Sequence, residues 1–259
     1  MPMSRHSPLF EYDDTVPAVI EPAEILKPVE GIAQHAVLCF FQDVIESLRK
    51  KHDFETIYTL GSEIGPNPVY QFEVEGRPLV VIHPGVGAPL AGAFLDELIA
   101  LGCRKFIACG GAGVLDSSIE MGQVQVPQSA VRDEGLSYHY LPPAREVAAH
   151  PQAIQAIIAA LNKHNVPYTL TKTWTTDAVY RETRAKVNHR RAEGCLTVEM
   201  EAAAFFAIAQ FRRCIFGQIL YGGDNVAAEQ WESRGWQGHM PVREQLFWVA
   251  AEACLGIGE

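Results

Sequence analysis

The chain has 259 residues, of which 48% are hydrophobic and 20% charged, and this suits one large α/β domain or two small ones. Its formal net charge of −10 argues against nucleic acid or an anionic membrane as a partner, because both attract basic surfaces. Residues 1–14 hold no apolar run, and the longest apolar stretches, such as 36–41 and 153–161, are too short to span a bilayer. We therefore expect a cytoplasmic protein with no membrane partner.

The start of the chain and the cysteines point to an ordinary intracellular protein with an unusual N-terminus. Prolines recur through residues 1–28, so we interpret 1–30 as an extended arm wrapped on the body or on a partner subunit, and 31–259 as the folded domain. The six cysteines show neither a CxxC pair nor a histidine at zinc spacing. We expect buried free thiols and no metal site.

The first half of the domain contains a βαβ pattern. Apolar runs predict strands at 36–41, 56–60, 69–74, 79–83 and 105–109, and apolar spacing predicts helices at 43–51 and 90–101. Glycine and proline predict turns at 65–68 and 75–78, while Pro89 and Gly102 suit the start and end of the second helix. The run from 79 to 109 is therefore strand, glycine turn, helix and strand, followed by a second glycine turn at 110–113.

Strands and helices continue to alternate in the second half, so a single domain is the economical interpretation. Strands are predicted at 123–127, 168–174, 195–198 and 214–221, and helices at 151–164, 184–191, 202–210 and 242–255. A glycine turn is predicted at 222–225, after the last strand, and polar loops at 131–140 and 230–239.

Glycines and acidic side chains follow several of these strands. Gly85, Gly87, Gly110 and Gly111 could let a ligand approach the backbone, although a dinucleotide fingerprint and a Walker pattern are both absent. Asp177, Glu199, Glu201 and Asp224 also come after strands. If the sheet is mostly parallel, these groups gather at one rim as a ligand pocket. Taken alone, the two glutamates also suit a plain helix N-terminus, which attracts acidic residues.

The order and spacing of four segments resemble the nucleoside phosphorylase superfamily, of the uridine phosphorylase and bacterial purine nucleoside phosphorylase type. The segments are 85–89, 110–115, 131–140 and 198–203, and the resemblance runs from about His83 to the C-terminus. It implies a single three-layer αβα domain with a mixed central sheet, and cleavage of the N-glycosidic bond of a nucleoside. It also implies a homo-oligomer, a dimer or a trimer of dimers. Sites in this family are often completed by a neighbouring subunit, and His6 is a candidate for that contact, although a solvated tail histidine is the simpler interpretation.

The resemblance assigns roles to particular residues. Glu201 and Met200 correspond to the ribose-binding pair, with Glu199 flanking the sugar. The base would meet Val179 and Tyr180, where Val179 replaces the family's stacking aromatic. Asp224 corresponds to the catalytic aspartate that protonates or hydrogen-bonds N7 of a purine. Gly85, Gly87, Gly110 and Gly111 would form the loops around the phosphate or other nucleophile.

The sequence departs from the family where phosphate should bind. The segment 39–44 lacks the family's glycine and arginine, Ala108 stands in place of a second arginine, and Gly111–Ala112 lack the expected hydroxyl. Without arginine, an anion is held less tightly and less specifically. Three functions stay open: a phosphorylase with phosphate as co-substrate and no other cofactor, a nucleosidase that uses water, and a non-catalytic nucleoside-binding or storage protein. The first is the leading interpretation.

Overall fold

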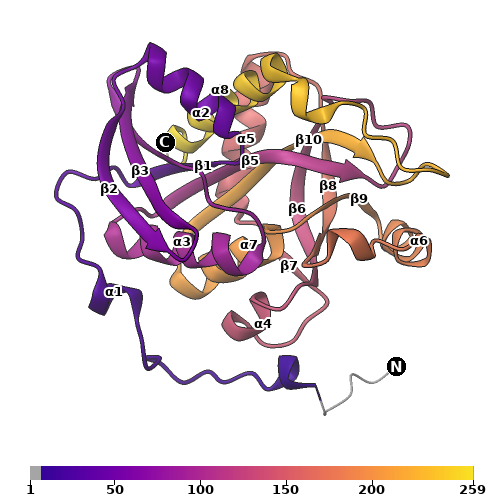
Figure 1. Ribbon diagram of the computed structural model, residues 1–259, viewed down its shortest axis with the longest axis horizontal. Helices are drawn as coiled ribbons and strands as arrows, with labels where there is room; N and C mark the ends of the chain where they lie inside the picture. The colour runs from indigo at the N-terminus through magenta and orange to yellow at the C-terminus, as the bar shows by residue number, and fades with distance from the viewer. Residues whose placement is uncertain (1–6, 259) are drawn as a thin grey trace.

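The computed structural model describes residues 7–258 (Figure 1). Its helices are α1 Pro22–Ile25, α2 Gln42–Lys51, α3 Ala88–Leu101, α4 Ser137–Tyr140, α5 Pro151–Lys163, α6 Arg184–Ala192, α7 Ala202–Arg212 and α8 Met240–Leu255. Its strands are β1 His35–Cys39, β2 Glu55–Ser62, β3 Gly65–Val74, β4 Arg77–Ile82, β5 Lys105–Val114, β6 Val124–Asp133, β7 Glu146–Ala148, β8 Tyr168–Thr176, β9 Cys195–Glu199 and β10 Ile215–Asn225. Short 3₁₀ turns are η1 Pro8–Phe10, η2 Val179–Arg181 and η3 Trp236–Gly238.

The strands form one mixed sheet within the described residues. Its order is β10-β6-β8-β9-β5-β1-β4-β3-β2, with β7 paired to β6. Strand β10 also pairs with β5, so the path from β10 through β6, β8 and β9 to β5 closes on itself. The β5–β1, β1–β4, β6–β8 and β8–β9 pairs are parallel, whereas β9 runs antiparallel to β5.

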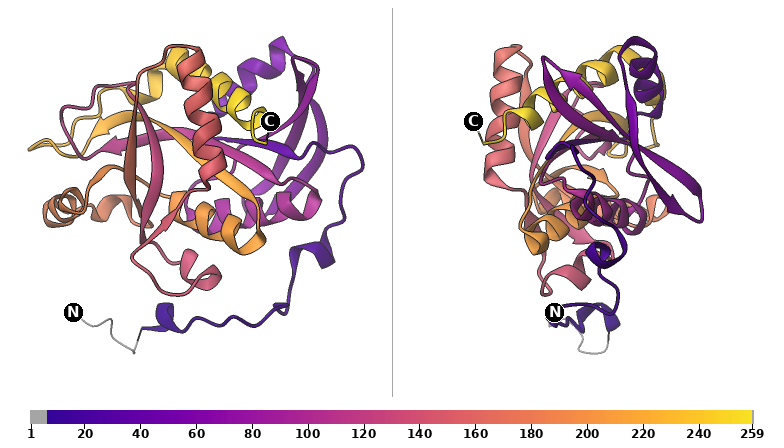
Figure 2. Two further views of the ribbon diagram at one scale, coloured as in Figure 1. Left: turned by 180° about the vertical axis from the view of Figure 1, so that it is seen from behind. Right: turned by 90° about the vertical axis from the view of Figure 1, so that its left-hand side faces the viewer.

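Helices cover both faces of the sheet, which confirms the three-layer αβα architecture (Figures 1 and 2). Helices α3 and α7 pack together on one face, and α5 packs with α8 on the other. Between them, the rings of Phe205 and Phe216 stack at 4.8 Å and those of Phe106 and Phe216 at 5.9 Å, with all three side chains buried. Burial of such large apolar rings supplies much of the stability of a core.

The predicted βαβ unit is confirmed as β4, α3 and β5. Pro89 lies in the first turn of α3, where its missing N–H costs nothing. Gly102 ends the helix with a φ of 131°, a conformation that side-chain-bearing residues rarely adopt. The apolar run of β4 is buried from Leu79 to Ile82, as expected for a strand covered on both faces.

Two predicted glycine turns are wrong, because the backbone there stays extended. Residues 110–113 belong to β5 and pair with β10 and β9, and residues 222–225 likewise belong to β10. In both places glycine admits a close neighbour rather than turning the chain. A Cβ on Gly111 would lie 3.1 Å from the Tyr221 ring, and one on Gly222 would lie 2.9 Å from the carbonyl oxygen of Glu120.

Two other local predictions also need correction. Residues 65–68 form the start of β3 rather than a turn, and the chain reverses at Glu63 and Ile64 instead. This part of β3 extends past β4 and pairs only with β2. A strand with one neighbour uses only every second backbone amide for pairing, so Pro66 and Pro68, which lack an N–H, are tolerated. The predicted loop 131–140 begins as the end of β6 and finishes as the short helix α4.

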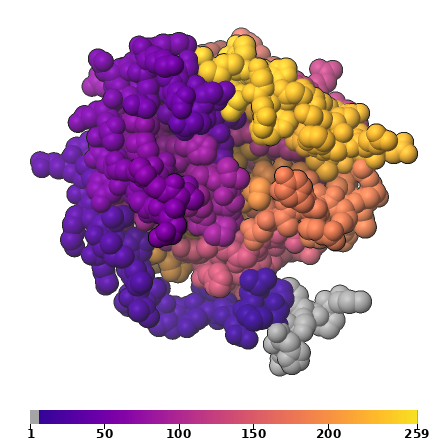
Figure 3. All heavy atoms as spheres, in the orientation of Figure 1, coloured from indigo at the N-terminus to yellow at the C-terminus, as the bar shows by residue number. Residues whose placement is uncertain are grey.

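Residues 7–30 run along the outside of the body, at the lower and left edges of Figure 1 and in indigo in Figure 3. Phe10 packs edge-on against Tyr138 at 5.6 Å, Glu21 forms an ion pair with Arg212, and the Val29 amide donates to the carbonyl of Leu101. The division into an arm and a domain stays a prediction, and His6 lies outside the described residues.

The six cysteines are free and buried, as expected. Across residues 7–258, no helix is long and apolar enough to cross a membrane.

Candidate functional site

The turn between β4 and α3 brings backbone amides to a buried carboxyl group. Gly85 and Gly87 have φ values of 77° and 90°, which only glycine adopts without strain. The Gly87 amide donates a hydrogen bond to Oε1 of Glu201, and the Gly85 amide donates to Nδ1 of His83 at 3.1 Å. Burial lowers the pKa of His83, so its imidazole is neutral at neutral pH and can accept that bond. The structure therefore joins the first glycine turn to Glu201.

Glu199 and Glu201 are both buried at the junction between β9 and α7. Thr175 donates its hydroxyl to Oε1 of Glu199 at 2.6 Å, and the amides of Glu201 and Ala202 donate to Oε2 at 2.7 and 2.6 Å. Both oxygens of Glu199 are thus used inside the protein. Glu201 has fewer internal donors, and burial together with the neighbouring Glu199 raises its pKa. Donors from a bound ligand would stabilise its carboxylate form.

Asp224 lies at the end of β10, where β5 and β9 also end. A Cβ on Gly113 would lie 3.0 Å from Val198 of β9 and 3.5 Å from Oδ1 of Asp224 in β10. Gly113, in β5, therefore lies between the ends of β9 and β10. The ends of β9 and β10 meet here because β9 pairs antiparallel with the last residues of β5, and not because all strands of the sheet are parallel. Trp231 donates its indole N–H to Oδ2 of Asp224 at 2.7 Å. The turn after Asp224 is held by Asn225, which accepts from the amides of Ala227 and Ala228.

Aromatic side chains cover the predicted anion-binding glycines of β5. A Cβ on Gly110 would lie 3.1 Å from the Phe40 ring, and one on Gly111 would lie 3.1 Å from the Tyr221 ring. The Tyr221 hydroxyl is itself committed, because it donates to the carbonyl of Trp236 at 2.9 Å. The two rings lie on opposite faces of β5, because Phe40 packs against Phe205 of α7 whereas Tyr221 packs against Phe41 on the side of α8. Each ring therefore occupies the space beside one glycine on its own face.

Arg243 of α8 lies beside Phe41, on the same face of the sheet as Tyr221. Its guanidinium is 4.7 Å from the centre of the Phe41 ring and donates to Asp43 at 2.7 Å. Its Nε atom is buried and has no hydrogen-bond partner among the described residues. Phe41 in turn packs against Tyr221, at 5.9 Å between ring centres. Sequence spacing gave no signal for this arginine, since it comes from the last helix.

The predicted base-binding segment forms an exposed edge. Asp177 accepts a hydrogen bond from the Gly135 amide at 2.8 Å, which ties this edge to the 131–140 segment. Val179 is 48% exposed and Tyr180 is 95% exposed. The side chain of Tyr180 is thus free of the protein, and its contact with a base stays a prediction.

Glu182 was missed by the sequence reasoning, although it follows this edge by two residues. It is half-buried, and burial together with the charge of Asp224 raises its pKa to about 7. A lone glutamate between a turn and a helix carries no pattern, so only its proximity to Asp224 could have revealed it.

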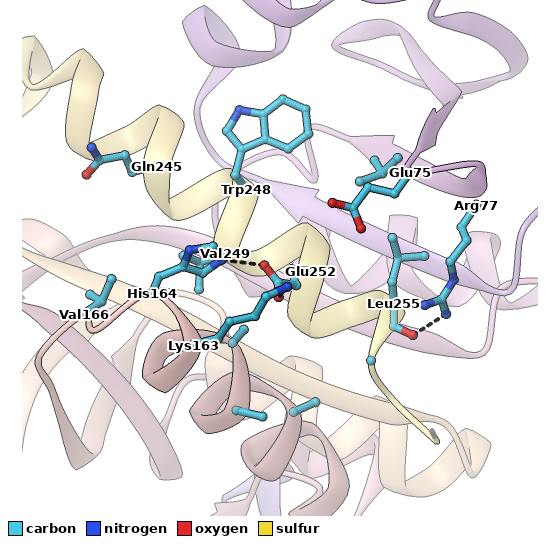
Figure 4. Close-up of a pocket in the computed structure, with 15 residues that line it drawn as sticks. Glu75, Arg77, Lys163, His164, Val166, Gln245, Trp248, Val249, Glu252 and Leu255 are labelled. Carbon is cyan, nitrogen blue, oxygen red and sulfur yellow. Dashed lines mark hydrogen bonds and ion pairs between the residues drawn. The ribbon is translucent and has the colours of Figure 1, made fainter.

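A separate cavity of about 900 Å³ lies between α5, α8 and the hairpin of β3 and β4 (Figure 4). Glu252 there pairs with Lys163 and His164, each at 2.6 Å, and none of the predicted site residues lines it. In the described part of the chain, no group of three or more His, Cys, Asp or Glu side chains could hold a metal ion.

Comparisons with known proteins place these features in context. Residues 34–245 match the family model of the phosphorylase superfamily. The chain is 27% identical over 154 residues to a guanosine phosphorylase of Halorubrum lacusprofundi, covering 60% of this chain and 64% of that protein. It is 25% identical over 153 residues to a uridine phosphorylase of Escherichia coli, covering 54% and 60%. The matches thus span less than two thirds of these relatives' lengths.

Solved structures share the fold at lower identity. An AMP nucleosidase from Bacteroides thetaiotaomicron superposes with a TM-score of 0.71 and 19% identity, over 87% of this chain and 88% of that one. A purine nucleoside phosphorylase from Toxoplasma gondii, in complex with immucillin-H, gives a TM-score of 0.75 and 20% identity, over 87% and 91%.

Proposed function

Because the chain belongs to the phosphorylase superfamily, we propose that it cleaves the N-glycosidic bond of a nucleoside at the rim formed by the Gly85 turn, Glu201 and Asp224. The substrate class we favour is a purine nucleoside, whose N7 can accept a hydrogen bond from a carboxyl group at Asp224. Pyrimidine nucleosides have no N7 and should be poor substrates.

Glu201 is the group we assign to the ribose. Its Oε1 atom is fixed by the Gly87 amide, so its carboxyl group is positioned before the ligand binds. Two ribose hydroxyls can donate to the carboxylate, and such bonds favour the charged form that burial opposes. Ribose contacts that strengthen as positive charge develops on the sugar lower the barrier to bond cleavage.

Water is the acceptor that the geometry favours. The observation that carries this step is the covering of Gly110 by Phe40 and of Gly111 by Tyr221. A phosphate dianion needs several N–H donors or a guanidinium to replace its hydration, and a ring occupies the space beside each of these two glycines, on opposite faces of β5. Water is small enough to reach the sugar without such a cradle.

Phosphate remains a second candidate acceptor because of Arg243. Its buried Nε without a partner lies next to Phe41, at the end of β1. A modest movement of Asp43 away from the guanidinium would free a charged donor for an anion. The relatives named as phosphorylases also favour this acceptor.

The test follows both products. Inosine, guanosine and uridine are incubated with the protein, with and without phosphate, in water enriched in ¹⁸O. We expect hypoxanthine or guanine to be released at the same rate in both, with ¹⁸O in the free ribose. Ribose 1-phosphate formed only with phosphate would overturn the choice of water.

Two arginine substitutions distinguish phosphate from water as the acceptor. If phosphate is used, Arg243→Gln should abolish the phosphate dependence, whereas Arg213→Gln, at an exposed arginine, should retain it. Tight binding of a nucleoside without release of any base would instead point to a non-catalytic binding protein.

A further inference from the structure

The loop after β10 carries Trp231, and the backbone of this loop is fixed by contacts that do not involve the Trp231 side chain. Asn225 and Glu232 exchange two backbone hydrogen bonds of 2.9 and 3.2 Å, and the side-chain amide of Asn225 donates to the Glu232 carboxylate at 2.8 Å. The Arg184 guanidinium donates to the carbonyls of residues 226–229, which lie in the turn between them. The position of Trp231, one residue before Glu232, is therefore set by the loop and not by its own ring.

The Trp231 ring is joined to Asp224 by a hydrogen bond. Its indole N–H donates to Oδ2 of Asp224 at 2.7 Å, and Trp231 is 64% exposed. A side chain this exposed buries little apolar area, so packing alone does not explain its place beside a carboxyl group. A donor at this distance restricts the rotation of the carboxyl group that accepts it.

The two oxygens of Asp224 have different surroundings. Oδ2 lies toward Trp231, whereas Oδ1 lies 3.5 Å from the position that a Cβ on Gly113 would take. Gly113 pairs with Val198 of β9, and β9 leads directly into the junction that carries Glu201. Oδ1 is therefore the oxygen on the side of the proposed ribose-binding group.

The indole group also determines which oxygen can carry a proton. An indole N–H can only donate, and it bonds best to a carboxyl oxygen that has no proton of its own. When Asp224 is protonated, the indole therefore holds Oδ2 as the carbonyl oxygen, and the proton is on Oδ1. The hydrogen bond thus places the acidic O–H toward the strands β5 and β9.

We propose that Trp231 is the positioning residue of the acid on the base side: its indole N–H holds Oδ2 of Asp224, so that Oδ1 gives its proton to the leaving purine. This inference rests on the proposed cleavage of a purine nucleoside. The Oδ1–H bond breaks as the proton moves to N7, and the C1′–N9 bond breaks with its electron pair moving onto the base. The oxygen of water bonds to C1′ and loses one proton to solvent, and the Asp224 carboxylate takes up a proton from solvent before the next turnover.

The test compares two leaving groups with the full-length protein. Inosine needs a proton on its base, whereas p-nitrophenyl β-D-ribofuranoside releases a stable phenolate that does not. We expect Trp231→Phe, which keeps a ring but removes the N–H, to lower kcat on inosine by about tenfold, the factor that one hydrogen bond to a carboxyl group typically contributes. KM for inosine and turnover of the nitrophenyl riboside should each stay within about twofold, because Trp231 acts through Asp224. Trp248→Phe, the same change at the separate cavity, is the matched control and should leave both activities unchanged.

A double-mutant cycle adds a readout that a merely structural role would not move. In Asp224→Ala the indole has no carboxyl group to orient, so adding Trp231→Phe should change the residual kcat on inosine by less than about twofold. A full tenfold loss in that background would show that Trp231 only supports the loop, and equal losses on both substrates would show the same. Either result, or an unchanged kcat on inosine in Trp231→Phe alone, would overturn the proposal. A parent protein that releases neither base nor nitrophenol would instead contradict the proposed function, and the role of Trp231 with it.

Discussion

Glu199 and Glu201 are two residues apart in the sequence, but their carboxyl groups have different tasks in the structure. Glu199 accepts from Thr175 and from the amides of Glu201 and Ala202, so it fixes the turn before α7. Glu201 accepts from Gly87 and lies at the rim with capacity for further donors. The ribose contact expected of Glu199 stays a prediction, whereas its role in holding the backbone follows from these bonds.

This contrast predicts opposite effects for the same chemical change. In Glu201→Gln the amide oxygen can still accept from Gly87, so stability should change by less than about 1 kcal/mol, while kcat/KM on ribonucleosides should fall by at least about tenfold. In Glu199→Gln an NH₂ group faces donors, which should cost about 1–3 kcal/mol of stability. Urea unfolding and steady-state kinetics on both variants measure this. A stability loss in Glu201→Gln as large as in Glu199→Gln, with unchanged kinetics, would show that Glu201 only caps the helix.

Within the strands, glycine serves close packing as well as turns. Gly217 lies in β10 under helix α5, and a Cβ there would be 2.8 Å from Ala153 and 3.1 Å from Ile157. Gly61 lies in β2, and a Cβ there would meet nothing within 4 Å. The same residue type therefore allows a helix to approach in one strand and has no packing role in the other.

We expect Gly217→Ala to destabilise the protein by about 1–3 kcal/mol, because the added methyl group must push α5 away from a well-packed sheet. Gly61→Ala should be neutral or slightly stabilising, since alanine restricts the unfolded chain more than glycine does. The free energy of unfolding in urea compares the two directly. Equal effects of the two substitutions would mean that α5 yields to the extra methyl group without cost.

At the scale of the whole molecule, the arm carries apolar side chains that the body does not cover. Val16, Val19, Ile20 and Ile25 are 64%, 100%, 68% and 67% exposed, and they border a groove of about 700 Å³ between the arm and the body. The arm is anchored there by Arg212, which pairs with Glu21 and Asp96. Contiguous exposed apolar side chains of this kind are typical of subunit interfaces.

The arm thus predicts that the protein is at least a dimer and that Ile20 lies at the contact. We expect Ile20→Asp to shift sedimentation velocity profiles toward the monomer at micromolar concentration, because burying a carboxylate at an interface is costly. Ile64, which is 72% exposed in the turn between β2 and β3, gives the matched control, and Ile64→Asp should leave the assembly unchanged. A parent protein that is monomeric at all concentrations would contradict the prediction.

Signals carried by neighbouring residues were enough to predict the local order of strands and helices. The apolar run before Pro84, the proline at the start of α3 and the glycine at its end are signals carried by neighbouring residues, so the βαβ unit could be predicted from them. The same holds for the change of pattern at Glu199 and Glu201, where a strand gives way to a helix. Such signals depend on backbone preferences and on burial period, which act over a few residues.

Contacts between residues distant along the chain could be identified only in the three-dimensional structure. The glycines at 110–113 and 222–225 looked like turns because a sequence cannot show the Tyr221 ring or the Glu120 carbonyl that requires them to be small. The closing of β10 onto β5, the guanidinium of Arg243 beside Phe41, and Glu182 beside Asp224 each join residues distant along the chain. Contacts of that kind arise from the packing of whole helices and strands, so they cannot be predicted from residue type and spacing alone.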